Sequence, residues 1–352
     1  MNFALNEDLE ALRQAAQRFA ERELAPGVRA AESRGCWSDE VLRVVDGFGL
    51  AGLDVPAERG GAGLGSLAKA VLLETLAHGD AGGLLAADPL GLAAGALVVC
   101  PDVTTAKTLA AACLGREGAC ALVVAADPGR APTRIEWTPA RTRWAWITDG
   151  DDLRLLELSA AVAAAPALAF HASGGGSIGL DGARTLGAWQ LDAGLGMQLR
   201  GRARLWAAAV ATGVAQAALD ATVAYATERI VFGKPVAHHQ GNAFELAVAA
   251  TRLQAARLMV RYAAAGFDDA DSNAGFWASQ AWLETMATAV TVTDLGVQLL
   301  GGHGFLKDHL AEKRFREARM LGLLAGGRDA ADADVAAGAL DPDPLFDMEA
   351  PA

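Results

Sequence analysis

Two polar stretches in the C-terminal third of the chain hold residue types that could contact a charged ligand. The first spans residues 225–240 and includes Arg229, whose guanidinium is a planar, permanently charged donor. The second spans residues 297–305 and includes Gly301 and Gly302, where a missing side chain allows a close approach. Each residue alone also fits a surface arginine or a helix-ending glycine, so only the combined spacing is informative.

The other reactive residue types form no metal or nucleophile motif. His238 and His239 are adjacent, so both cannot face one ion from a regular helix, and neither an HExxH nor a phosphate-loop pattern occurs. The cysteines lack CxxC pairing, which favours buried, reduced thiols in a cytoplasmic protein. They are Cys36, Cys100, Cys113 and Cys120. We therefore expect no metal site.

Together, the two stretches resemble the C-terminal domain of the acyl-CoA dehydrogenase family of flavoenzymes. The match continues from residues 297–305 to Arg314, Arg316 and Arg319. The resemblance implies an FAD cofactor that accepts a hydride from the acyl β-carbon, while a carboxylate removes the α-proton. It also implies a dimer in which the β domain of one subunit holds the flavin ring. The helical bundle of the neighbour then contacts the pyrophosphate and the adenosine.

The residues that would contact a neighbour's FAD are complete in the sequence. By resemblance, Arg229 meets the pyrophosphate and Phe232 supplies an apolar surface. Two further residues match positions with hydrogen-bonding side chains, and three match the loop that approaches the adenosine. These are His239 and Gln240, and Gln298, Gly301 and Gly302, respectively.

The residues that would hold this chain's own flavin ring are altered. One strand matches the family's Trp-Ile-Thr sequence, which packs against the flavin, although a core tryptophan gives the same pattern. Its residues are Trp146, Ile147 and Thr148. Upstream, the family's Thr-Glu-Pro reads Ala-Asp-Pro at 126–128, so the threonine that reaches the flavin is replaced by Ala126. The serine near the acyl-CoA is not recognisable, and the β domain looks shortened.

The family's catalytic glutamate is absent from both positions where members of the family carry it. The usual position is Ala325, followed by Gly326-Gly327 in place of Gly-Thr, and the rarer position is Ala203. A positioned general base contributes about 10²–10⁴-fold to a rate, and alanine cannot supply it. Arg204 matches the family's arginine beside the acyl end of the substrate, although its basic surroundings also fit a solvated face. Two nearby carboxylates could replace the base: Asp329 and Asp332.

Composition and periodicity favour a mainly α-helical protein with a small central β domain. Hydrophobic residues are 52% and charged residues 20% of the 352 residues, which excludes a mostly disordered chain. We expect an N-terminal helical domain at 1–118, a shortened β domain at 119–198 and a C-terminal four-helix bundle at 199–340. A loose tail would follow at 341–352. This order of domains is that of the acyl-CoA dehydrogenase fold.

Local signals predict individual elements. Apolar spacing over 7–24 predicts a helix that stops before Pro26. Apolar runs at 121–124, 143–147 and 167–171 predict strands. Long stripes at 205–229, 242–265 and 275–300 predict the helices of the bundle.

The net charge and the N-terminal sequence indicate which binding partners and which cellular location to expect. A formal charge of −12 disfavours nucleic acid, because phosphate binding needs a basic surface. The start of the chain lacks a signal-peptide pattern and no clean apolar run is long enough to span a bilayer, so we expect a cytoplasmic protein.

Three functional interpretations remain open. In the first, the chain is a subunit without a base that completes the FAD site of a glutamate-bearing homologue, in an α2β2 tetramer acting on an acyl-CoA. In the second, it is a homotetrameric FAD-dependent dehydrogenase with a relocated base. In the third, it binds, hydrates or dehydrates an acyl thioester without flavin.

Overall fold

Helices fill the N-terminal region, where polar side chains cap the helix starts. The computed structural model describes residues 5–125, 132–159, 165–166 and 168–339. At the first helix, the Asn6 side chain accepts a hydrogen bond from the Leu9 N–H at 2.9 Å. The helices are α1 (Glu7–Phe19), α2 (Ala25–Arg34), α3 (Asp39–Asp46), α4 (Ser66–Ala87), α5 (Ala94–Val99) and α6 (Val103–Leu114).

Two local features of this region differ from a plain reading of the sequence. Pro26 does not end the first helix: the chain passes through a π-helical turn at Ala20–Leu24, and Pro26 lies in the first turn of α2. Proline is tolerated there because its missing N–H has no acceptor within the helix. Helix α4 bends at Asp80, whose φ of −162° and ψ of 119° are extended rather than helical.

The β region forms two small sheets. A four-stranded sheet has the order β1-β3-β4-β7, with β1 and β3 parallel and the other pairs antiparallel. A three-stranded sheet has the order β2-β6-β5. The strands are β1 (Ala119–Val124), β2 (Arg134–Thr138), β3 (Thr142–Asp149), β4 (Asp152–Glu157), β5 (Ala165–Pro166), β6 (Gly176–Gly179) and β7 (Arg184–Gln190).

One strand prediction was wrong. No strand covers the described part of 167–171, where Phe170 has a φ of 55° and turns the chain. A left-handed residue cannot continue a β ladder, and its apolar side chain is buried from a turn instead.

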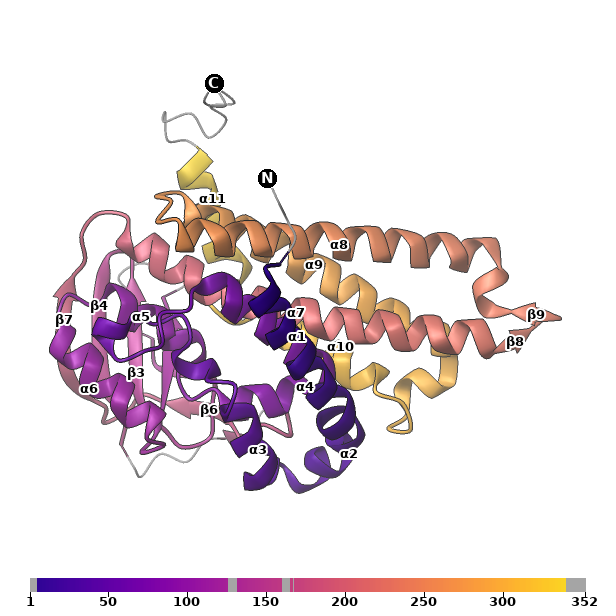
Figure 1. The fold of residues 1–352 in the computed structure, drawn as a ribbon, viewed down its shortest axis with the longest axis horizontal. Helices are drawn as coiled ribbons and strands as arrows, with labels where there is room; N and C mark the ends of the chain where they lie inside the picture. Colours follow the sequence, from indigo (N-terminus) through magenta and orange to yellow (C-terminus); the bar gives the residue numbers. More distant parts are fainter. Residues whose placement is uncertain (1–4, 126–131, 160–164, 167, 340–352) are drawn as a thin grey trace.

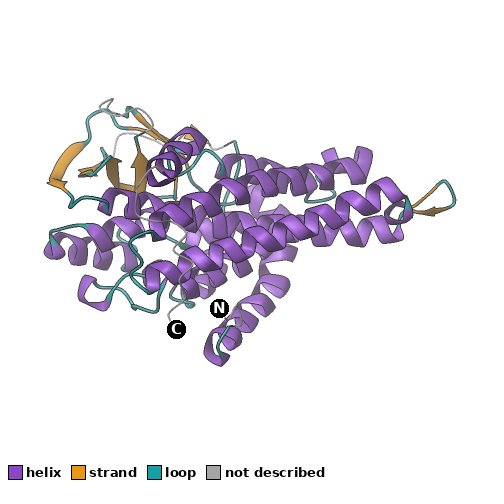
Figure 2. Cartoon of the chain, turned by 90° about the horizontal axis from the view of Figure 1, so that it is seen from above, coloured by secondary structure: helices purple, strands orange, loops and turns teal. Residues whose placement is uncertain are grey.

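A helical bundle completes the fold and extends away from the sheets (Figures 1 and 2). Its close packing depends on small residues: a Cβ at Gly201 of α7 would lie 2.5 Å from the Cα of Gly275 in α9. Helix α7 is long and apolar enough to span a bilayer, yet 72% of its apolar window is buried by the rest of the chain. The helices are α7 (Leu195–Glu228), α8 (Gln240–Asp268), α9 (Ala274–Leu300), α10 (Ala311–Leu321) and α11 (Gly327–Ala339).

Candidate functional site

The structure brings the two polar stretches together at the free end of the bundle. A small apolar cluster joins the ends of α7, α9 and α10 through Tyr225, Val297, Leu300, Ala311 and Phe315. The Tyr225 ring also meets His309 edge-on, with the ring centroids 5.9 Å apart. The two stretches therefore form one surface, which we call the distal surface: residues 229–240 and 298–303.

A short hairpin projects from this surface. Strands β8 (Ile230–Val231) and β9 (Lys234–Pro235) enclose Phe232 and Gly233, at the far right of Figure 1. The Phe232 side chain is 95% exposed. His239 supports the hairpin from behind, with its Nε2 3.0 Å from the carbonyl oxygen of Val231.

The strained tip of the hairpin gives a first prediction. Phe232 has a φ of 52° and Gly233 a φ of 81°, the turn geometry for which Asn-Gly is preferred. Replacing Phe232 by asparagine should stabilise the free chain by about 1 kcal/mol, because phenylalanine is strained in this region. Urea unfolding measures the change. Phe305→Asn, at a residue 73% exposed on the same end, is the control and should give no gain.

Three further polar residues of the distal surface are accessible. Arg229 ends α7, Gln240 begins α8 and Gln298 lies in the last turn of α9, all with exposed side chains. A Cβ added at Gly301 or Gly302 would meet no atom within 4 Å. This surface can therefore accept a ligand or a second chain at close range.

The predicted flavin-facing strand is, in contrast, fully covered. Trp146 and Thr148 of β3 have 0% exposure, and Ile147, on the opposite face of the strand, has 4%. The Trp146 ring packs against Trp189 of β7, with the centroids 5.7 Å apart. The Thr148 hydroxyl donates to the carbonyl oxygen of Gly150 at 3.4 Å. The side chains that would face a flavin are therefore part of the protein core.

The loop that carries Ala325 closes the space above this strand. A Cβ added at Gly326 would lie 2.8 Å from Cγ1 of Val124, the β1 residue paired with Thr148. A planar ring held between two surfaces needs about 7 Å, which is two van der Waals contacts of ~3.5 Å. The residues present therefore do not fit a flavin ring in this chain. Ala126, which replaces the threonine that reaches the flavin in the family, lies outside the described residues.

Neither predicted base position, nor either predicted replacement, offers a carboxylate to this space. Ala325 and Ala203 are 6% and 1% exposed and belong to the main core. Asp329 and Asp332 are exposed on α11, and Asp332 pairs with Arg328 at 3.2 Å. Arg204 is buried rather than solvated, so the alternative of a solvated basic face does not hold for it.

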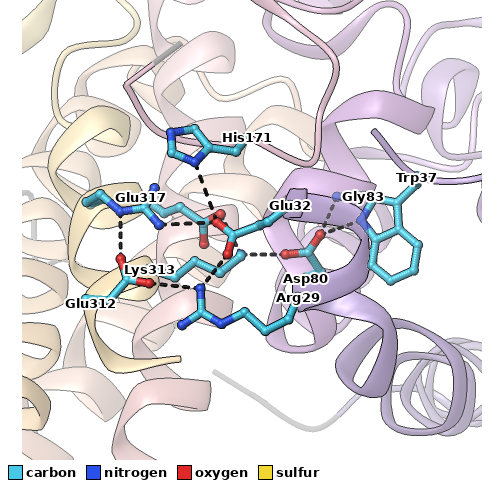
Figure 3. A network of polar contacts seen from close by, with 10 residues as sticks. Arg29, Glu32, Trp37, Asp80, Gly83, His171, Glu312, Lys313 and Glu317 are labelled. Atoms are coloured by element: carbon cyan, nitrogen blue, oxygen red, sulfur yellow. Dashed lines mark hydrogen bonds and ion pairs between the residues drawn. The ribbon is translucent and has the colours of Figure 1, made fainter. Parts of the chain in front are cut away.

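A buried ionic network that the sequence did not predict holds α10 in place (Figure 3). At the bend of α4, Asp80 accepts hydrogen bonds from the Trp37 indole at 2.6 Å and the Gly83 N–H at 2.7 Å. Its other oxygen lies 2.5 Å from Lys313 Nζ, which also contacts Glu317 at 2.6 Å. Extended backbone at Asp80 thus points a carboxylate at α10.

A second group of ion pairs lies beside this network and connects α10 to α2. Glu32 of α2 pairs with Arg316 at 3.2 Å and with Arg29. Arg29 also reaches Glu312 at 2.8 Å. Helix α10 is therefore fixed to α2 and α4 along one side. The sequence signal that could have predicted this was the spacing of Glu312, Lys313, Arg316 and Glu317, which places alternating charges on one helix face.

The network gives a prediction about pH. Burial, together with repulsion from Asp80, raises the pKa of Glu317 from 4.5 to about 7, although Lys313 opposes this. The folded state thus holds this proton more tightly than the unfolded chain. Glu317 contributes stability below pH 4.5, and this contribution is lost as the pH rises through about 7. Subtracting the stability of Glu317→Gln from that of the unmodified chain, by urea unfolding from pH 4.5 to 8, should give a falling curve; a flat difference would contradict the assignment.

The cysteines form no disulfide bonds, and the described residues contain no group that could bind a metal ion. All four cysteines are free, and burial raises the pKa of Cys113 to about 12. Cys36 is exposed, so the expectation that every thiol is buried was wrong for this residue. Across the described ranges, no group of three or more His, Cys, Asp or Glu side chains could hold a metal ion.

Comparison with known proteins identifies the family. The model of the acyl-CoA dehydrogenase C-terminal domain matches residues 196–340, and that of the N-terminal domain matches residues 6–99. The chain belongs to the acyl-CoA dehydrogenase family. Its fold is also that of butyryl-CoA dehydrogenase from Megasphaera elsdenii, with a TM-score of 0.78 and 19% identity over 97% of this chain and 100% of that chain.

Individual members of the acyl-CoA dehydrogenase family differ in how much of the chain they match. Cyclohex-1-ene-1-carbonyl-CoA dehydrogenase of Geobacter metallireducens is 39% identical over 130 residues, which cover 37% of this chain and 34% of that protein. The mitochondrial short-chain specific acyl-CoA dehydrogenase of Bos taurus is 28% identical over 92% of this chain and 87% of its own length. The stronger identity is thus confined to about a third of the chain.

Proposed function

We propose that this acyl-CoA dehydrogenase-like chain is a subunit without its own base that completes the FAD site of a partner subunit. An asymmetry between its two ends carries the proposal. The distal surface is exposed and open at Arg229, Phe232 and Gly301. The residues that would hold its own flavin and base, Thr148 and Ala325, are buried.

The distal surface has suitable chemistry for this role. FAD, when bound in the partner, supplies the acceptor for a hydride from the acyl β-carbon of an acyl-CoA. From this chain, Arg229 would donate charged hydrogen bonds to the pyrophosphate. The open backbone at Gly301 and Gly302 would lie against the adenosine, and Gln240 and Gln298 would supply amide hydrogen bonds. The partner would be a homologous subunit that keeps the glutamate, in an α2β2 tetramer.

The two other interpretations are weaker. A homomeric enzyme with a relocated base needs a carboxylate in the space above β3, but Asp329 and Asp332 are exposed on α11. A flavin-independent acyl-thioester protein would share the covered strand, but it would give no reason for the open arginine and glycine residues of the distal surface.

Flavin content tests the proposal. The chain should be colourless when purified alone and should form a yellow complex when co-expressed with a glutamate-bearing homologue from the same genome. Addition of acyl-CoA should then bleach the flavin absorbance of the complex. A yellow homotetramer that is bleached by acyl-CoA would support the homomeric interpretation instead. A colourless chain that binds acyl-CoA without any partner would support the flavin-independent one.

A further inference from the structure

Arg204, which the family resemblance places beside the acyl end of a substrate, is occupied by another part of the chain. Its side chain is 0% exposed. Its Nη1 donates to Ser279 Oγ at 2.7 Å and to Asp334 Oδ2 at 2.5 Å. Its Nε and Nη2 are buried and have no hydrogen-bond partner among the residues that the structure describes. The charge of Arg204 is therefore balanced from within the chain, by Asp334.

Asp334 also binds a second arginine of α7, Arg200, which itself reaches the sheet. Arg200 Nε and Nη2 donate to its two oxygens at 2.7 and 2.6 Å. Arg200 Nη1 donates to the carbonyl oxygen of Gly150, in the turn between β3 and β4, at 2.8 Å. Burial of the Asp334 carboxyl opposes ionisation, but these arginines lower its pKa below the ordinary value. The Asp334 carboxylate thus links α11 to α7, and Arg200 links α7 to the sheet.

The loop next to this carboxylate needs such an anchor. Ala325, Gly326 and Gly327 have φ values of 55°, 91° and 70°, three successive residues with positive φ that lead from the loop after α10 into the first residue of α11. Alanine does not favour this conformation, so the surrounding structure must hold it. The ionic network holds α10 on one side of the loop, and Asp334 holds α11 on the other.

We propose that Asp334 is an internal lock. By binding Arg204 and Arg200, its carboxylate holds the 324–327 loop against Val124 and closes the space above β3 to a flavin ring and an acyl group. Asp334 is a positioning residue in this role. The inference rests on the proposed function, because it concerns this chain's own flavin and base positions, which that function treats as inactive.

Hydrogen exchange tests the lock. In Asp334→Asn, which removes the charge and keeps the shape, amides of the 322–330 segment should exchange on the order of 100-fold faster, because the buried Arg204 and the partly buried Arg200 lose their counter-ion. Asp332→Asn is the matched control on the same helix, with a side chain 51% exposed, and should exchange like the unmodified chain. Asp334→Ala should also loosen the loop. Formate should restore its protection and chloride should not, because formate can replace the missing carboxylate.

The hydrogen-exchange experiment can fail or succeed independently of the flavin test of the proposed function. Unchanged exchange in Asp334→Asn, or equal loosening in the control, would overturn the lock. If Asp334→Asn does not fold, Asp334→Glu keeps the charge, displaces the carboxylate, and is judged by the same exchange. Helix α11 lies away from the hairpin (Figure 1), so Asp334→Asn should leave the flavin content of the complex unchanged. A complex without flavin would refute the proposed function and leave the exchange result standing.

Discussion

Substituting Lys313 with methionine is expected to lower the free energy of unfolding by about 3–5 kcal/mol. Lys313 is 3% exposed and lies within 2.6 Å of carboxylate oxygens on both Asp80 and Glu317. Its removal leaves two carboxyl groups facing each other without a cation. The loss of stability is large because the desolvation of the two buried carboxylates is then no longer offset by an ion pair.

Urea unfolding at pH 8 would measure this loss, since Glu317 is then ionised in the unmodified chain. Lys307→Met is the control, because Lys307 is exposed on the loop before α10. It should change stability by no more than about 0.5 kcal/mol. A loss below about 1 kcal/mol in Lys313→Met would mean that the network contributes little to holding α10.

Removing the Arg229 guanidinium should weaken FAD binding in the complex with a glutamate-bearing partner by roughly 10- to 100-fold. This range corresponds to one hydrogen bond to a charged group, about 1.5–3 kcal/mol. Flavin release during dilution, followed by fluorescence, measures the effect of Arg229→Ala. The isolated chain should unfold as before, because the Arg229 side chain is exposed to solvent.

A matched variant separates binding from general damage. Arg18→Ala removes an equally exposed arginine from α1, distant in sequence from the distal surface. It should leave the flavin content unchanged. Equal flavin loss in both variants, or none in Arg229→Ala, would argue against a role for the distal surface in binding the partner's cofactor.

Sequence patterns predicted the order of domains and the long bundle helices well, because apolar stripes of twenty or more residues leave little ambiguity. They failed where tertiary contacts decide. Asp80 leaves helical geometry inside an apolar helix because Lys313, more than two hundred residues away, needs a carboxylate. The turn at Phe170 has the same apolar composition as a buried strand, and only its backbone conformation distinguishes them.

For the site, the sequence predicted which residues resemble those of the family but not whether their side chains are buried or exposed. It could not show that Trp146 is covered by Trp189, since the two lie on strands that are not neighbours in sequence. It also favoured Asp329 and Asp332 as carboxylates of interest and overlooked Asp334. Helical phase explains this: Asp334 points inward from α11, whereas the other two face solvent.

The contact between Gly326 and Val124 would make the proposed loss of the base difficult to reverse in evolution. A single change of Ala325 to glutamate would place a carboxylate at a position that is 6% exposed, in a loop packed against β1. Such an intermediate would lose stability without gaining a reaction. Reversion would require several coordinated changes in the loop, in α11 and in β1, each unfavourable alone. The dependence on a partner that we propose would then be preserved by the packing of the chain, even without selection for the partnership.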